Sequence, residues 1–253
     1  MRRSVLIAYL VLIHGLLVLV LMKSDFLQKA GRKLGVTPQK QEIAEHYKGM
    51  LSFHVRMDGN VPYQAVVFIG DSSIQGLYAD AVACPSVSYG IGSDTTVGVL
   101  RRLPHYRSLT HASAVVLAIG GNDMKYRDNQ AIVQNYRRIL QAIPQGVPVV
   151  CSAVLPVNET MMTPGGFSNA RIRSLNAALQ SLCTSDPRCI FLDVGSKLVD
   201  SAGNLSASFQ DGDGLHLNSA GNQIWIDELR DAVKKAQQVG EANPVLNPGD
   251  GSQ

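Results

Sequence analysis

Short apolar runs alternate with amphipathic stretches along most of the chain. The run 65–69 is rich in β-branched residues and ends at Gly70, which is typical of a buried strand. Similar runs recur at 86–89, 114–119, 147–154 and 189–194. Between these runs, apolar residues recur at three- and four-residue intervals, as on one face of a helix. The predicted helices cover 96–103, 129–143, 169–183 and 219–238. Asp94 and Ser219 stand where two of them begin and are the expected N-caps. Because strands and helices alternate, we expect an α/β fold with a parallel sheet covered on both faces.

The segments outside this pattern set the expected domain boundaries. Residues 24–62 are rich in Lys, Gln and Glu, and 41–53 has some helical periodicity. We expect this linker to be either a stalk or an N-terminal helix packed on the domain, which itself covers 63–238. Residues 239–253 are rich in Asn, Pro and Gly and lack a core pattern, which predicts a disordered tail.

A long apolar run over residues 5–22 follows Arg2 and Arg3. At about 1.5 Å per residue, a helix of this length nearly spans a hydrocarbon core of roughly 30 Å. We expect an uncleaved signal anchor over 1–23, with both arginines cytoplasmic and the rest of the chain exported to the periplasmic or extracellular side. The alternative is a cleaved signal peptide and a secreted protein, although 22–26 makes a poor cleavage site.

Amino-acid composition and charge limit the classes of function that the protein can have. The chain has 253 residues, of which 45% are hydrophobic, enough for one domain of ordinary size and a separate end segment. The net charge is only +3, and much of the excess lies near the N-terminus. No basic face indicates nucleic acid as a partner. The sequence does not set the oligomeric state.

Four cysteines are present, without a CxxC pair or His/Cys metal spacing, so a structural zinc site is not expected. Cys183 and Cys189 flank the predicted turn 184–188. They form either a disulfide, if the domain lies in an oxidising compartment, or two free thiols. Cys151 lies in an apolar run and is expected to be buried.

A serine, a histidine and an aspartate form a candidate catalytic group. Ser72 follows the first predicted strand, where a strand-to-helix turn exposes a hydroxyl and helix-start N–H groups can stabilise negative charge. Ser73 is an alternative nucleophile, and helix capping is the alternative role of Ser72. His216 is the candidate base. Asp213, three residues earlier, can reach its Nδ1 atom, fix its tautomer and stabilise the imidazolium. Such a pair is also half a metal site, but no second ligand cluster accompanies it, so no metal is expected.

Two further segments can donate hydrogen bonds to the oxyanion that forms when a nucleophile attacks an ester. Asn122 can donate from its side-chain amide, and the glycines before it let the backbone come close. The segment 90–93 can donate backbone N–H groups. Each segment by itself is equally an ordinary turn or glycine loop. Asp123 is expected to cap or brace its loop rather than to be the triad acid.

Together these segments resemble the SGNH, or GDSL-type, hydrolase superfamily. The matching blocks are Gly70-Asp71-Ser72-Ser73, Gly90-Ile91-Gly92-Ser93-Asp94-Thr95-Thr96, Gly120-Gly121-Asn122-Asp123 and Asp213-Gly214-Leu215-His216. The resemblance makes Ser72 the nucleophile and Asn122 an oxyanion donor, beside the backbone N–H of Ser72. A third donor is the N–H of Gly92 or of Ser93, which stands where the family usually has a glycine. The resemblance covers 65–236 and implies a flavodoxin-like three-layer α/β/α sandwich and no cofactor.

The expected activity is ester hydrolysis through a covalent acyl-enzyme. Members of this superfamily cleave acetyl groups from sugars, lysophospholipids, acyl thioesters and simple esters. An exported domain with 6% aromatic residues and no long apolar lid favours short acyl groups, such as O-acetyl on an envelope or extracellular glycan. The alternatives are a lysophospholipase- or thioesterase-like lipid hydrolase, a glycan O-acetyltransferase, and a non-catalytic glycan-binding envelope protein.

Overall fold

The computed structural model describes residues 9–10, 12–15, 45–163 and 167–242. The chain divides into two units, residues 1–44 and residues 45–253. In the first unit the described residues are helical, but the predicted signal anchor over 1–23 lies largely outside them. None of the helices in the described ranges combines the length and the apolar character that crossing a membrane requires.

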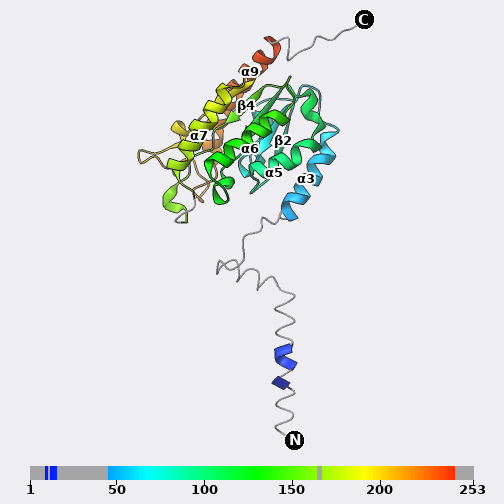
Figure 1. Ribbon diagram of the computed structural model, residues 1–253. Coiled ribbons are helices and arrows are strands. Elements are labelled where there is room, and N and C mark those ends of the chain that lie inside the picture. The colour runs from blue at the N-terminus through cyan, green and yellow to red at the C-terminus, as the bar shows by residue number, and fades with distance from the viewer. Residues whose placement is uncertain (1–8, 11, 16–44, 164–166, 243–253) are drawn as a thin grey trace. The chain divides into compact units, whose positions relative to one another are not determined.

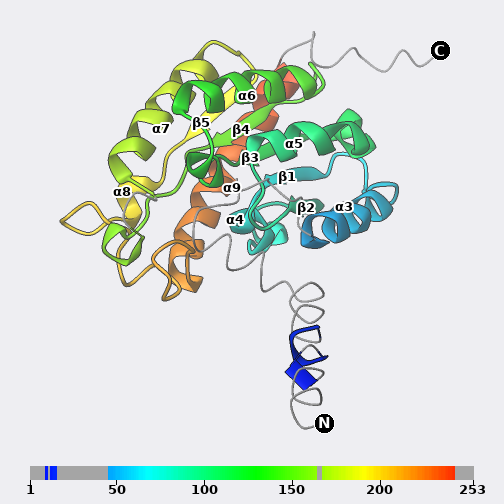
Figure 2. The ribbon, with the colours of Figure 1, turned by 60° about the horizontal axis from the view of Figure 1, so that its bottom comes forward.

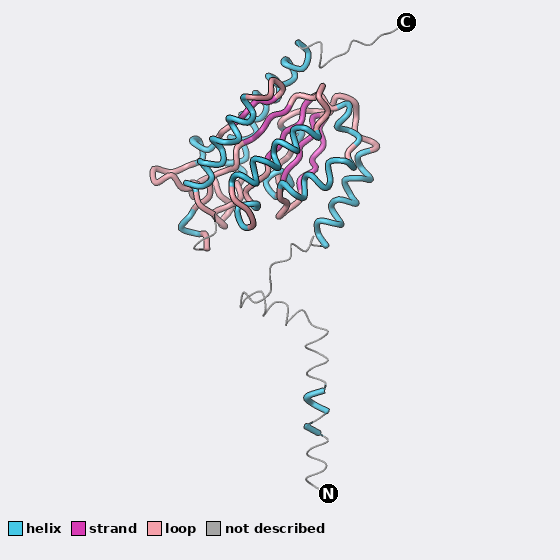
Figure 3. The backbone as a smooth tube through the Cα atoms, viewed as in Figure 1, coloured by secondary structure: helices cyan, strands magenta, loops and turns pink. Residues whose placement is uncertain are grey.

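A five-stranded sheet forms the centre of the second unit (Figures 1 and 3). Its strands are β1 (Val66–Gly70), β2 (Ser86–Gly90), β3 (Ala114–Ala118), β4 (Val149–Ser152) and β5 (Cys189–Leu192). The order is β2-β1-β3-β4-β5, and every neighbouring pair is parallel. This is the flavodoxin-like order, in which ligands bind beyond the carboxyl ends of the strands. The predicted strands and the parallel α/β sheet are confirmed.

Helices cover both faces of the sheet. They are α3 (Glu45–Asp58), α4 (Ser72–Gln75), α5 (Thr96–Arg102), α6 (Asn129–Ala142), α7 (Asn169–Thr184), α8 (Gly195–Leu198) and α9 (Ser219–Ala242). Because successive strand residues point to opposite faces, β1 contributes to two cores. Val67 and Ile69 of β1 pack in a core with α5, α6 and α7. Val66 and Phe68 pack in the other core with α4, α8 and α9. In Figure 2, α4 and α9 lie across the strands from α5 and α6.

The helix α3 packs on the domain and is not part of a free stalk. The Asp58 carboxylate at its end is buried and accepts hydrogen bonds from Tyr89 Oη at 2.7 Å, Ser108 Oγ at 2.6 Å and the Arg107 N–H at 2.7 Å. These bonds satisfy the carboxylate, which would otherwise be costly to bury. The compact unit therefore begins at Glu45, well before the expected start of the domain at residue 63.

The expected N-cap of α5 is wrong by one position. Thr95 caps this helix, and its side chain accepts a hydrogen bond from the Gly98 N–H. Asp94 instead pairs with the fully buried Arg102, whose Nε lies 2.8 Å from the carboxylate. The same guanidinium donates to the carbonyl oxygens of Gly70 and Tyr89, near the ends of β1 and β2. A buried cation requires such partners. Asp94 therefore forms an ion pair with Arg102 and does not cap the helix.

The last helix also differs from the prediction at its ends. Asn218, rather than Ser219, is the capping side chain, because its Oδ1 accepts the Gly221 N–H at 3.0 Å. The helix continues to Ala242, four residues past its expected end. The rest of the predicted tail, 243–253, lies outside the described residues.

The cysteines divide into a pair and two free thiols. Cys183, at the end of α7, and Cys189, at the start of β5, form a disulfide. The free thiol of Cys151 is buried in β4, as predicted, whereas Cys84 is exposed. Of the two alternatives for the pair, the structure contains the bonded one.

Candidate active site

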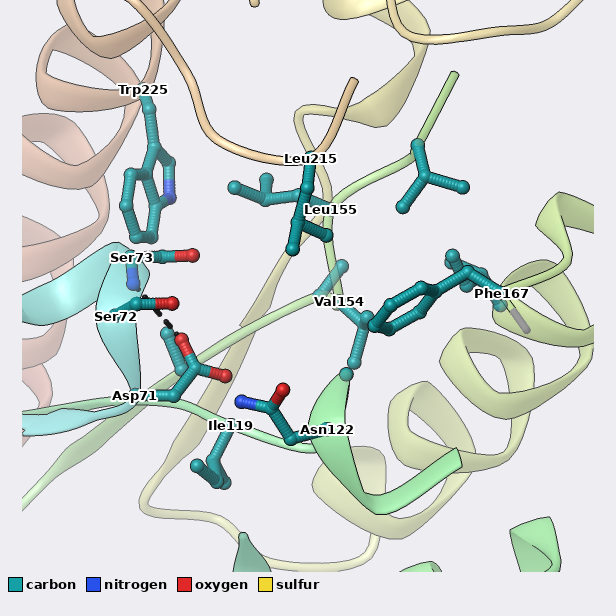
Figure 4. A pocket seen from close by; sticks show the side chains of 15 residues that line it. Asp71, Ser72, Ser73, Ile119, Asn122, Val154, Leu155, Phe167, Leu215 and Trp225 are labelled. Atoms are coloured by element: carbon teal, nitrogen blue, oxygen red, sulfur yellow. Dashed lines mark hydrogen bonds between the residues drawn. The ribbon is translucent and has the colours of Figure 1, made fainter. Parts of the chain in front are cut away.

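The turn after β1 places Ser72 at the carboxyl edge of the sheet. Gly70 ends β1, and α4 begins at Ser72. A Cβ atom at Gly70 would lie 2.2 Å from the carbonyl oxygen of Ala118, so this close approach of β1 and β3 requires glycine. Asp71 caps α4 by accepting the Ser73 N–H at 3.0 Å. The Ser72 hydroxyl consequently points into a pocket at the start of the helix (Figure 4).

Two hydrogen bonds connect Ser72 with the predicted base and acid. The Nε2 atom of His216 lies 2.9 Å from Ser72 Oγ. Its Nδ1 atom lies 2.5 Å from Oδ2 of Asp213. The structure thus brings these three predicted residues together in the order that activates a serine hydroxyl. Within the described ranges, no group of three or more His, Cys, Asp or Glu side chains is arranged to hold a metal ion.

The Asp213 carboxylate is held in its charged form. Partial burial would raise its pKa, but hydrogen bonds from the backbone and side chain of His216 and from the Leu215 N–H outweigh this and lower the pKa. Oδ1 accepts the Leu215 N–H at 2.8 Å and the His216 N–H at 2.9 Å. The other oxygen is therefore left to face the imidazole. An ionised Asp213 can stabilise the imidazolium that forms when Ser72 loses its proton.

Asn122 reaches the same pocket from the end of β3. It begins the short 3₁₀-helix Asn122–Lys125, and its amide nitrogen points toward the side of the pocket that holds Asp71 and Ser72 (Figure 4). This nitrogen donates one hydrogen bond to the Asp94 carbonyl oxygen at 3.1 Å. The amide has two N–H groups, so a second one is left for a bound oxygen.

Asp123 takes the bracing position expected of it and lies apart from His216 in the hydrogen-bond network. Its buried carboxylate accepts from the N–H of Thr96 at 2.9 Å and from the Thr96 hydroxyl. It also forms an ion pair with Arg127. Asp123 therefore ties the loop that carries Asn122 to the start of α5.

The structure distinguishes the two candidates for the backbone oxyanion donor. The N–H of Gly92 donates to Oε1 of Gln75 at 2.5 Å, so this group is already engaged. The backbone N–H of Ser93 has no hydrogen-bond partner within the described part of the chain. Ser93 is exposed and has a φ of 64°, a left-handed conformation that is uncommon for a residue other than glycine. Such an outlier is typical of a functional loop.

An apolar wall completes the pocket beside Ser72 (Figure 4). It is formed mainly by Val154, Leu155, Phe167, Ile172, Leu215 and Trp225. The cavity volume is about 50 Å³. One water molecule needs about 10–15 Å³ on the same measure, so the pocket admits a small group, and it is partly open to solvent, so this volume does not by itself limit the length of a bound group. No sequence pattern indicated this wall, because its side chains come from separate segments and each resembles an ordinary core residue.

The fold and the arrangement of Ser72, His216 and Asp213 define a hydrolase of ester bonds. Residues 68–224, more than half of the chain, match the GDSL-like Lipase/Acylhydrolase family. The chain belongs to this family, which confirms the resemblance seen in its sequence. A comparison with curated proteins finds no match.

Several solved structures have a similar fold. A protein from Streptococcus pneumonia aligns with a TM-score of 0.70 and 24% identity, over 77% of this chain and 95% of that one. A GDSL-like lipase from Bacteroides thetaiotaomicron aligns with a TM-score of 0.63 and 19% identity, over 74% and 98% of the two chains. The acetyl xylan esterase AlAXEase aligns with a TM-score of 0.57 and 17% identity, over 67% and 99%. At these identities the likeness shows the shared fold.

Proposed function

We propose that this enzyme removes short acyl groups, above all O-acetyl, from envelope or extracellular carbohydrate through an acyl-enzyme on Ser72. The observation that carries the proposal is the pair of hydrogen bonds linking Asp213 to His216 and His216 to Ser72. This arrangement converts a weakly nucleophilic hydroxyl into a reactive one.

The first half of the proposed reaction acylates the enzyme. Ser72 Oγ attacks the ester carbonyl carbon while its proton passes to Nε2 of His216, and Asp213 stabilises the imidazolium. The tetrahedral oxyanion accepts hydrogen bonds from the Asn122 amide and from the backbone N–H groups of Ser72 and Ser93. His216 then gives the proton to the leaving alcohol oxygen as the ester bond breaks. The acyl group remains on Ser72.

The second half restores the enzyme. A water molecule gives a proton to His216 as its oxygen attacks the acyl carbon, and a second oxyanion forms in the same hole. Collapse of this intermediate breaks the bond to Ser72 Oγ, which takes the proton back from His216. The products are a carboxylic acid and free enzyme, and no cofactor takes part in any step.

Two features support a short acyl group. The pocket volume of about 50 Å³ accommodates a group such as acetyl, and the sequence, with 6% aromatic residues, has no long apolar lid for a fatty acyl chain. Carbohydrate is proposed as the alcohol component for two reasons. The N-terminal sequence predicts export, where the domain would meet envelope polysaccharide and peptidoglycan as well as lipid, and one protein of similar fold is described as an acetyl xylan esterase.

The test uses the full-length protein purified in detergent, with Ser72→Ala and Ser73→Ala as a matched pair. Hydrolysis of p-nitrophenyl esters is followed from acetyl to long acyl chains, and then acetate release from O-acetylated glycans. We expect preference for acetyl esters, loss of turnover in Ser72→Ala and retention of turnover in Ser73→Ala.

Preference for long chains would favour a lipid or thioester hydrolase. Transfer of acetate to sugar acceptors in preference to water would favour an acetyltransferase. Absent turnover together with no fluorophosphonate labelling of Ser72 would favour a binding protein.

We also propose that the catalytic domain is exported and held at the membrane by residues 1–23. The support is Arg2 and Arg3 before the apolar run 5–22, together with a disulfide that suits an oxidising compartment. Expression in a bacterial host, alkaline extraction of membranes and added protease provide the test. An anchored, exported domain stays with extracted membranes and is digested from outside. A soluble mature form that lacks the N-terminus would show that the segment is a cleaved signal peptide.

A further inference from the structure

The catalytic loop that carries Asp213 and His216 is closed by its own backbone. Gln210 and Leu217 form an isolated antiparallel bridge at the two ends of the loop. Just inside it, the Asp211 N–H donates to the His216 carbonyl oxygen at 2.9 Å. Residues 211–216 therefore form a small loop with fixed ends. The conformation of its tip must be set by other contacts.

Packing alone does not hold the tip. The side chains of Asp213 and His216 are 48% and 38% exposed. Gly212 and Gly214 flank Asp213 and have φ values of 91° and 71°, in the left-handed region that glycine adopts readily. A loop with two glycines and exposed side chains has many accessible conformations unless hydrogen bonds select one.

Several hydrogen bonds make that selection, among them the bond from the Asn158 N–H to the Gly214 carbonyl oxygen at 2.7 Å, and Gln210 accepts two more. Oε1 of Gln210 accepts the N–H of Gly212 at 2.6 Å and the N–H of Gly214 at 2.9 Å. These two N–H groups lie on either side of Asp213. Both lone pairs of a single amide oxygen are thus used to fix the backbone that presents the Asp213 carboxylate to His216.

The geometry points to Gln210 as a positioning residue for the Asp213–His216 pair, an inference that rests on the proposed function. Its acceptor oxygen holds the backbone around Asp213 so that Oδ2 lies 2.5 Å from Nδ1 of His216. The residue touches neither substrate nor reacting atoms. It acts by keeping the carboxylate in the narrow range of positions that catalysis requires.

Two substitutions with side chains of similar length distinguish the hydrogen-bonding role of Gln210 from a role of its side-chain volume alone. Gln210→Met keeps the length of the side chain and removes the acceptor, whereas Gln210→Glu keeps an oxygen that can accept both N–H groups. We expect Gln210→Met to lose about tenfold to a hundredfold in kcat, with KM nearly unchanged, because misplaced catalytic groups slow chemistry more than binding. Gln210→Glu should recover most of the wild-type kcat.

The assay uses full-length protein and p-nitrophenyl acetate, with thermal unfolding of each variant as the check on folding. Wild-type kcat in Gln210→Met, or equal losses in both variants, would overturn the inference. An equal fall of kcat and thermal midpoint in the two variants would do the same, because it indicates a structural role only. Failure of the proposed function gives a different result, since wild-type protein would then lack turnover that depends on Ser72.

Discussion

The Nε2 atom of His216 lies 2.9 Å from the Oγ atom of Ser72, although 144 positions separate the two residues along the chain. Ser72 comes from the turn after a central strand, and His216 comes from the loop before the last helix. Both lie at the carboxyl edge of a parallel sheet, where folds of this order place their ligands.

Removal of the Asn122 side-chain donor should slow catalysis without abolishing it. We expect Asn122→Ala to lower kcat by about a hundredfold to a thousandfold, as for other oxyanion donors. The backbone N–H groups would supply the remaining stabilisation. Steady-state kinetics on p-nitrophenyl acetate measures the effect, with Ser72→Ala as the floor. Activity close to that of the native enzyme would remove Asn122 from the oxyanion hole.

Truncation of Phe167 should lengthen the acyl chain that the enzyme accepts. This side chain forms part of the pocket wall, so Phe167→Ala enlarges the cavity. We expect kcat/KM to rise for butyryl and hexanoyl esters relative to acetyl. The control is Phe53→Ala, since Phe53 is 47% exposed on α3 and does not line the pocket. An unchanged chain-length profile in Phe167→Ala would show that the acyl group binds elsewhere.

Asp71 should make folding stability fall between pH 4 and pH 6. Burial raises the pKa of this carboxyl from 3.8 to about 6. In this window the folded protein binds the proton more strongly than the unfolded chain, so the free energy of unfolding decreases as pH rises. The total decrease in the free energy of unfolding due to Asp71 is about 3 kcal/mol, at 1.36 kcal/mol per pKa unit. Urea unfolding across the window should show that Asp71→Asn removes this contribution to the pH dependence of stability, whereas Asp231→Asn, at an exposed position, leaves the pH dependence unchanged.

The buried ion pair of Arg102 and Asp94 should be costly to break from one side. Arg102→Met leaves a buried carboxylate without its partner, which typically costs about 3–5 kcal/mol. Adding Asp94→Asn removes the stranded charge and should recover part of this loss. Urea unfolding of the two single variants and the double variant measures the coupling. Additive losses would show that the pair does not act as a unit.

Loss of the disulfide should lower stability modestly. Cys183 and Cys189 are six positions apart, and closure of so short a loop contributes about 2 kcal/mol. Replacement of both by alanine should shift the urea midpoint, and reductant should shift native protein to the same value. Cys84→Ala, which alters a free thiol, is the control. A native midpoint that does not respond to reductant would contradict the prediction.

Local patterns were sufficient for much of the fold. The β-branched run that becomes β1 ends at Gly70, and the intervals of apolar residues in 129–143 and 169–183 predicted α6 and α7 within two residues of their ends. Helix caps were less predictable. Thr95 and Asn218 are caps because their side chains reach an N–H in the first turn, which depends on rotamers that the sequence does not reveal.

The sequence by itself determined which residues could carry the chemistry, because Ser72, Asn122, Asp213 and His216 each stand in a short segment whose spacing is local. Only the tertiary structure decided how they meet and what surrounds them. In the folded domain the Gly92 N–H donates to Gln75, and Asp58 holds α3 on the domain. The apolar wall of the pocket, which includes Trp225, also forms only there. These features depend on contacts between segments far apart in the chain. Such contacts depend on the packing of the whole domain and cannot be predicted from the local spacing of residues.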